Sequence, residues 1–167
     1  MRSNTLLFLC TGNYYRSRFA EILFNHRAEE LDVAWRAESR GVAIECGAHN
    51  VGPLSPHARQ GLAARGIPLP KMVRFPMPLQ ESDLLCARHV VAVKEAEHRP
   101  LLRERFADWE ARVEYWAIDD IDCALPETAL VLLAQRVEQL LTRAYTAGDL
   151  FPSTSTESET DPTKDES

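Results

Sequence analysis

Short apolar segments alternate with segments of helical periodicity along this chain, and this alternation constrains the fold more than any other feature. Strands are expected at about residues 5–10, 33–42, 89–94 and 112–118. Helices are expected at about residues 17–30, 55–66, 82–87, 95–109 and 127–145. Because strands that alternate with helices form parallel sheets covered on both faces, the sequence predicts an α/β fold. We expect a small doubly wound, four-stranded parallel sheet with helices on both faces.

The first strand-to-helix connection has a composition that favours ligand binding. Residues 6–10 are continuously apolar, and Gly12 and Asn13, which tolerate positive φ, follow directly. From Ser17, a residue type that favours the N-cap, apolar residues recur at helical spacing. Ligands of doubly wound folds bind at the carboxyl ends of strands. The sequence therefore predicts a binding loop after the first strand.

Cys10 and Arg16 indicate what such a loop would bind. Backbone N–H groups of the loop and the N-terminus of the next helix converge on one point, which suits a tetrahedral oxyanion. The same positive field stabilises a cysteine thiolate. Arg16 can hold two oxygens of the anion with its planar guanidinium. Together these groups favour nucleophilic attack on phosphorus.

The segment LFLCTGNYYRSRFAE resembles the signature of the low-molecular-weight protein tyrosine phosphatases, in which a cysteine is followed after five residues by Arg and Ser. The resemblance extends through AESRGV, NVGPLSPHARQGLAARGI, DLLCARHVVAVK and VEYWAIDDID, and covers most of residues 4–147. It implies a phosphomonoester hydrolase that forms a cysteinyl-phosphate intermediate and uses no metal or cofactor. Its substrate would be a phosphorylated protein or a small phosphomonoester, and inorganic phosphate would be a product.

The resemblance also assigns roles to the loop residues. In the family the cysteine attacks phosphorus, the arginine binds equatorial oxygens, the asparagine holds the loop and the serine supports the thiolate. By position these roles fall on Cys10, Arg16, Asn13 and Ser17. The loop expected to bind phosphate comprises Thr11, Gly12, Asn13, Tyr14, Tyr15, Arg16 and Ser17.

A general acid is expected after the fourth strand, where a carboxyl group would protonate the leaving oxygen and then activate water. The family usually has an Asp-Pro pair there, and no aspartate of this segment precedes a proline. Counting from Trp116 places the family position at Asp120, with Ile121 in place of proline. Asp120 is the expected acid, and Asp119 and Asp122 remain alternatives.

Several residues depart from the family pattern. Tyr15 stands where many members have a second cysteine, and Lys94 stands where the third strand often ends in an acid. Members that act on phosphoarginine tend to have threonine at the position of Tyr14, so that substrate is disfavoured. We expect His98 on an exposed helical face, and Arg74 on a solvated basic face.

Two other functions share parts of this pattern. An arsenate reductase on the same scaffold would need further cysteines just beyond the third strand, and the segment KEAEHRP has none. A non-catalytic phosphate- or phosphoprotein-binding module would keep the binding loop but would not hydrolyse the phosphate ester. The presence of a cysteine, an arginine and nearby aspartates argues against it.

Charge and cysteine usage bear on domains, partners and compartment. The net charge is −6, of which residues 151–167 carry −4, so the remaining chain is nearly neutral. We expect a catalytic domain at 1–150 followed by an acidic, Ser/Thr-rich disordered tail at 151–167. Near-neutrality argues against a nucleic-acid partner, and no apolar run has the roughly 20 residues of a membrane span. The four cysteines include no Cys-x-x-Cys pair, which favours reduced thiols and the cytoplasm. Three of them (Cys46, Cys86 and Cys123) are expected to lie away from the loop.

Overall fold

The computed structural model describes residues 4–150, and the predicted tail at 151–167 lies outside the described residues. The strands are β1 (Thr5–Cys10), β2 (Arg36–Gly41), β3 (His89–Ala92) and β4 (Glu114–Tyr115). The α-helices are α1 (Arg16–Glu30), α2 (Pro56–Ala64), α3 (Glu81–Cys86), α4 (Glu95–Arg105) and α5 (Pro126–Ala147). Two short 3₁₀ helices, η1 (Ile44–Gly47) and η2 (Ala107–Arg112), complete the described part. Within residues 4–150, none of the helices combines the length and apolarity needed to cross a bilayer.

The four strands form one parallel sheet in the order β2-β1-β3-β4. β1 lies at its centre, paired with β2 from Thr5–Arg36 through Cys10–Gly41 and with β3 on its other side. The chain therefore winds outwards in both directions from β1, which makes the carboxyl end of β1 the point where ligands bind in folds of this kind. The predicted doubly wound α/β fold is confirmed.

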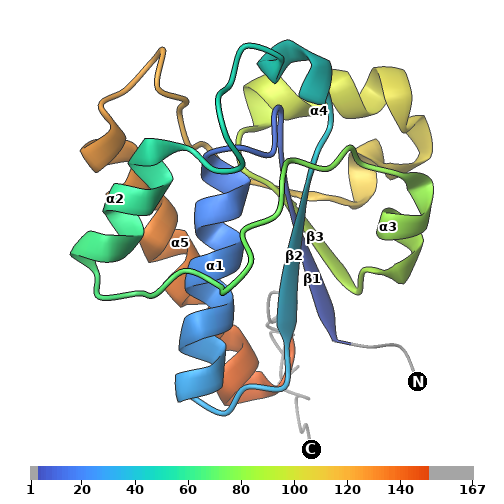
Figure 1. The fold of residues 1–167 in the computed structure, drawn as a ribbon. Coiled ribbons are helices and arrows are strands. Elements are labelled where there is room, and N and C mark those ends of the chain that lie inside the picture. Colours follow the sequence, from blue (N-terminus) through green and yellow to red (C-terminus); the bar gives the residue numbers. More distant parts are fainter. Residues whose placement is uncertain (1–3, 151–167) are drawn as a thin grey trace, which may run out of the picture.

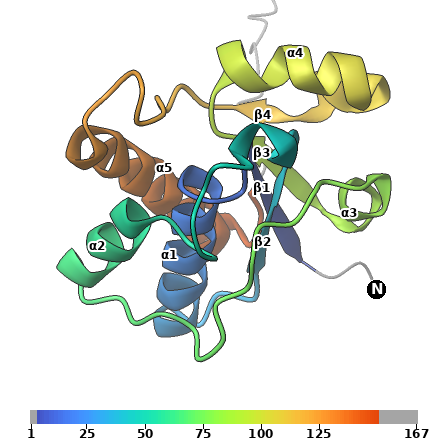
Figure 2. The ribbon, with the colours of Figure 1, turned by 45° about the horizontal axis from the view of Figure 1, so that its top comes forward.

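Each face of the sheet has its own hydrophobic core, and Figures 1 and 2 show α1, α2 and α5 on one side with α3 and α4 on the other. Alternate residues of β1 point to opposite faces. Phe8 and Cys10 therefore join the core under α1 and α5, while Leu7 and Leu9 join the core under α3 and α4. Burial on both sides explains why β1 is continuously apolar.

The structure changes the bounds of several predicted elements. β4 spans two residues, because after Tyr115 the chain pairs with Lys94 through an antiparallel bridge at Ala117. The helix expected at 95–109 ends at Arg105, and the 3₁₀ helix η2 follows. α1 begins at Arg16 with Tyr15 as its N-cap, so Ser17 does not cap it.

Candidate active site

The loop between β1 and α1 lies at the carboxyl edge of the sheet, directly before the N-terminus of α1 (Figure 1). Asn13 has a φ of 51°, in the left-handed region that asparagine tolerates better than most residues. This turn lets the backbone N–H of Asn13 donate back to Cys10 Sγ at 3.3 Å. The loop therefore curls around the sulfur.

Cys10 receives a second contact from Ser17 in the first turn of α1. Its Sγ lies 2.9 Å from Ser17 Oγ, and its side chain is buried, with 3% exposed. Ser17 Oγ accepts a hydrogen bond from Asn13 Nδ2 at 2.9 Å, which leaves the hydroxyl proton free to donate to the sulfur. Two donors aimed at one sulfur stabilise a thiolate. This use of the hydroxyl also explains why Ser17 is not the helix cap.

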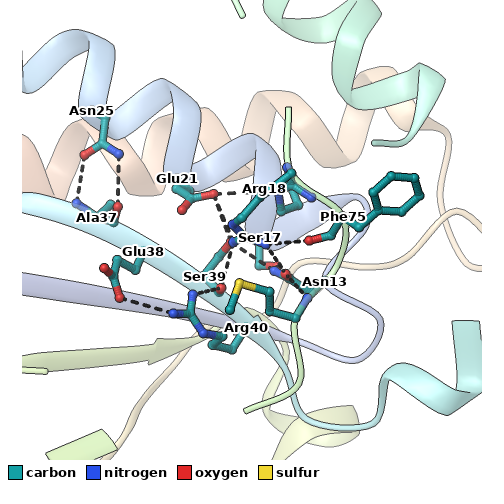
Figure 3. Close-up of polar contacts among 12 residues, drawn as sticks. Asn13, Ser17, Arg18, Glu21, Asn25, Ala37, Glu38, Ser39, Arg40 and Phe75 are labelled. Atoms are coloured by element: carbon teal, nitrogen blue, oxygen red, sulfur yellow. Dashed lines mark hydrogen bonds and ion pairs between the residues drawn. The ribbon is translucent and has the colours of Figure 1, made fainter. Parts of the chain in front are cut away.

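Asn13 is fully buried, and all four hydrogen-bonding positions of its side chain are used. Its Nδ2 also donates to Ser39 Oγ at 2.9 Å, as Figure 3 shows. Its Oδ1 accepts from Arg74 Nη1 at 2.9 Å and from the backbone N–H of Met77 at 3.0 Å. The loop is thus anchored to β2 and to the irregular segment before α3.

Arg74 corrects an expectation, because it lies in this network rather than on a solvated face. It also donates to the backbone carbonyl of Ser39 at 2.9 Å and lies 3.5 Å from a carboxylate oxygen of Glu21. Ser39 donates to the same carboxylate at 3.1 Å. A proline-rich segment carries no periodicity, so its arginine could not be assigned a partner from the sequence.

Arg16 is the most enclosed charged group at this edge, with 2% of its side chain exposed. Its guanidinium donates to the backbone carbonyl of Ile118 at 3.0 Å and to Asp120 Oδ2 at 3.2 Å. It also forms two hydrogen bonds with Glu97, a residue of α4 for which the sequence predicts no role. Glu97 is 81 positions away in the chain, and no motif marks it.

The three candidate aspartates occupy different surroundings. Asp119 forms an ion pair with Lys94 at 2.8 Å. Asp120 contacts Arg16, and its Oδ1 accepts from the N–H of Ile121 at 2.8 Å. Asp122 is exposed. Asp120 is therefore the aspartate that the structure brings into contact with Arg16.

A cavity of about 460 Å³ opens over the loop. Cys10, Arg16 and Asp120 line it together. The wall includes residues of the loop, of α2 and of the segment around η1: Thr11, Gly12, Tyr14, Tyr15, Cys46, His49, Asn50 and His57. Cys46 therefore lies beside the loop, contrary to expectation, because η1 folds back over it.

The two tyrosines of the loop are held differently. Tyr14 donates to the carbonyl of Val51 at 2.6 Å at the cavity rim. Tyr15 is buried and packs edge-on against His57, with ring centres 6.1 Å apart. Burial, followed by the charge of Asp120, raises the pKa of Tyr15 to about 12, so its hydroxyl stays protonated. Tyr15 is thus the one of the pair that packs into the core.

The sequence profile of the "Low molecular weight phosphotyrosine protein phosphatase" family matches residues 5–123. The chain belongs to this family. None of the curated proteins matches the chain by sequence. Solved structures do match, including the low molecular weight protein tyrosine phosphatase of T. tengcongensis, which is 25% identical with a TM-score of 0.69. That alignment covers 83% of this chain and 98% of the other.

Two further solved structures have the same fold. YfkJ from Bacillus subtilis is 23% identical, with a TM-score of 0.72, over 87% of this chain and 96% of its own. The YwlE arginine phosphatase, solved as a cysteine-to-serine mutant with a phosphorylated active-site serine, is 22% identical. It has a TM-score of 0.69, over 88% of this chain and 99% of its own.

Membership of the low-molecular-weight phosphatase family makes this protein a cysteine-dependent phosphatase of the protein tyrosine phosphatase type. Its substrates are phosphorylated, and phosphate is a product. This reading is favoured over the arsenate reductase and the non-catalytic module.

Gly41, at the end of β2, is expected to be essential for the shape of the phosphatase loop. A Cβ at this position would lie 2.7 Å from the backbone oxygen of Thr11 and 3.1 Å from the backbone nitrogen of Asn13. Gly41→Ala should therefore displace the loop and lower kcat/KM for an aryl phosphate by about 10-fold to 10²-fold. Gly66→Ala is the matched control. Gly66 has a positive φ that alanine disfavours, but an added Cβ there would meet no neighbouring atom, so this variant should lose stability without a change in kcat/KM. Full activity of Gly41→Ala would contradict this account of the loop.

Proposed function

We propose that Cys10 is the nucleophile, that Arg16 binds the transferred phosphoryl group and that Asp120 is the general acid. The observation that carries this proposal is that Asp120 contacts Arg16 in the wall of the cavity that also contains the Cys10 sulfur. The nucleophile, the anion ligand and the proton donor therefore face one volume.

The reaction follows from these positions. The Cys10 thiolate attacks phosphorus, and the bond from phosphorus to the leaving oxygen breaks while Asp120 transfers its proton to that oxygen. Arg16 and the N-terminus of α1 stabilise the charge on the equatorial oxygens. Asp120, now a carboxylate, accepts a proton from water as the water oxygen attacks the cysteinyl phosphate. Inorganic phosphate leaves, and the Cys10 thiolate is restored.

We further propose that the substrate is a phosphorylated protein or a small phosphomonoester rather than phosphoarginine. One structural neighbour is described as an arginine phosphatase, but this cavity is lined by Tyr14, whose side chain is much larger than that of threonine. The four unpaired cysteines favour a reducing compartment, which supports the cytoplasm. The nearly neutral charge of residues 1–150 gives no reason to expect a nucleic-acid partner.

The assignment of Asp120 is tested by the dependence of rate on the leaving group. Asp120→Ala should slow hydrolysis of an alkyl phosphate by roughly 10²–10⁴-fold, because the leaving oxygen of such a substrate needs a proton. The loss should be smaller for nitrophenyl phosphate, whose leaving group departs as an anion. Asp119→Ala, the matched control, should show no such dependence. If Asp119→Ala shows it and Asp120→Ala does not, the general acid is Asp119.

A further inference from the structure

Glu97 binds the two terminal nitrogens, Nη1 and Nη2, of the Arg16 guanidinium. Arg16 Nη1 donates to Glu97 Oε2 at 3.1 Å, and Nη2 donates to Glu97 Oε1 at 2.8 Å. The remaining hydrogen of Nη1 is directed at the carbonyl of Ile118, and that of Nη2 at Asp120. Among the described residues, no hydrogen bond is found for Nε. The edge formed by Nε and Nη2 is therefore the one available to an anion.

The two carboxylates on Arg16 are held in different ways. Asp120 contributes one bond at 3.2 Å, on the Nε side of Nη2, where two oxygens of a bound phosphoryl group would lie. Glu97 contributes two bonds on the opposite edge, which a phosphoryl group would not need. Substrate can therefore replace Asp120 on Arg16 while Glu97 stays in place.

A directed set of hydrogen bonds ties Glu97 to the phosphate loop. The backbone N–H of Lys94 donates to His98 Nδ1 at 3.1 Å, so the neutral ring carries its proton on Nε2. His98 Nε2 then donates to Thr11 Oγ1 at 3.1 Å, and the Thr11 hydroxyl donates to Glu97 Oε1 at 2.5 Å. His98 is fully buried, which corrects the expectation of an exposed helical histidine.

The surroundings keep Glu97 ionised and His98 neutral. Burial alone would raise the pKa of Glu97. The His98 Nε2–H, which also lies 3.4 Å from Glu97 Oε1, and the donors of Arg16 and Thr11 outweigh burial and hold that pKa well below its usual range. Burial lowers the pKa of His98, against the attraction of Glu97. Arg16 and Glu97 thus form a charged pair with each partner oriented by neighbours.

We propose that Glu97 is a positioning residue of this phosphatase. It fixes the guanidinium of Arg16 so that the Nε–Nη2 edge faces the phosphoryl group, and it joins that arginine to Thr11 at the start of the loop. The inference rests on the proposed role of Arg16 in binding phosphate. It assigns a function to α4, whose N-terminus is brought to the loop by the adjacent strand β3.

Two variants of Glu97 test this role, with Glu95→Ala as a matched control. Glu95 lies in the same turn of α4, is exposed, and pairs with half-buried Arg99 instead. Glu97→Ala should lower kcat/KM for an aryl phosphate by about 10²-fold and weaken competitive inhibition by inorganic phosphate. Glu97→Gln keeps the shape but places an amide N–H₂ against Arg16, so it should also lose activity while retaining the fold. Glu95→Ala should match the wild type in both measurements.

A double-mutant cycle with Arg16→Ala separates positioning from a general structural effect. If Glu97 acts through Arg16, adding Glu97→Ala to Arg16→Ala should cause no further loss of kcat/KM or of phosphate inhibition. Equal losses in both backgrounds would overturn the inference, as would increased activity or tighter phosphate inhibition in either single variant of Glu97. If Arg16→Ala alone leaves both measurements unchanged, the proposed role of Arg16 itself is wrong.

Discussion

Replacing Cys10 with serine is expected to abolish phosphatase activity, with a loss in kcat of roughly 10⁴–10⁶-fold. The sulfur of Cys10, the proposed nucleophile, lies 2.9 Å from the hydroxyl of Ser17 and accepts from the N–H of Asn13. A serine hydroxyl in the same place remains protonated, since no base among its contacts takes its proton. The loop anchors through Asn13, so Cys10→Ser should keep its shape and still bind inorganic phosphate. Hydrolysis of nitrophenyl phosphate and stabilisation by phosphate in a thermal melt measure the two effects.

Cys86→Ser is the matched control for this prediction. Cys86 is an exposed thiol at the end of α3, on the opposite side of the sheet from α1. Its replacement should leave the rate unchanged. Retention of more than a few per cent of the wild-type rate by Cys10→Ser would remove Cys10 as the nucleophile.

Replacing Arg16 with lysine should lower kcat/KM by roughly 10³-fold, although the positive charge is kept. An ammonium group cannot bind two phosphoryl oxygens with a planar edge. It also cannot reproduce the paired bonds to Glu97 together with those to Ile118 and Asp120. Arg16→Lys should therefore weaken phosphate inhibition as well as kcat/KM, and its melting temperature should fall.

Arg59→Lys serves as the control, because Arg59 is exposed on α2 and lies outside the site. It should leave kcat/KM and the melting temperature unchanged. A fully active Arg16→Lys would show that a point charge is sufficient, and it would contradict the bidentate role of Arg16.

Local patterns made the sheet and the phosphate loop predictable. β1 is buried on both faces, so its apolar run is continuous, and the Gly12–Asn13 pair marks the turn that follows. The positive φ of Asn13 is a property of that one residue and its neighbours. The family resemblance added roles for Cys10 and Arg16 that rest on residues within a single segment.

The partners of that loop were not predictable, because they come from distant segments without periodicity. Glu97, His98 and Arg74 meet the loop only once α4 and the irregular segment before α3 have packed. A helical histidine beside glutamates has the pattern of an exposed face, and burial is decided by tertiary contacts. The length of β4 was not predictable either, because a pairing of only two residues leaves little signal in the sequence.

The most direct test of the proposed chemistry is detection of the cysteinyl phosphate. Asp120→Ala should be mixed with nitrophenyl phosphate and quenched in acid within the first turnovers, and its peptides analysed by mass spectrometry. Loss of Asp120 should slow attack by water more than attack by Cys10 on this substrate, so the intermediate should accumulate. We predict one phosphoryl group on the peptide that contains Cys10, and none in Cys10→Ser/Asp120→Ala. Turnover with the phosphoryl group on another residue, or with no phosphorylated enzyme at any time, would contradict the account.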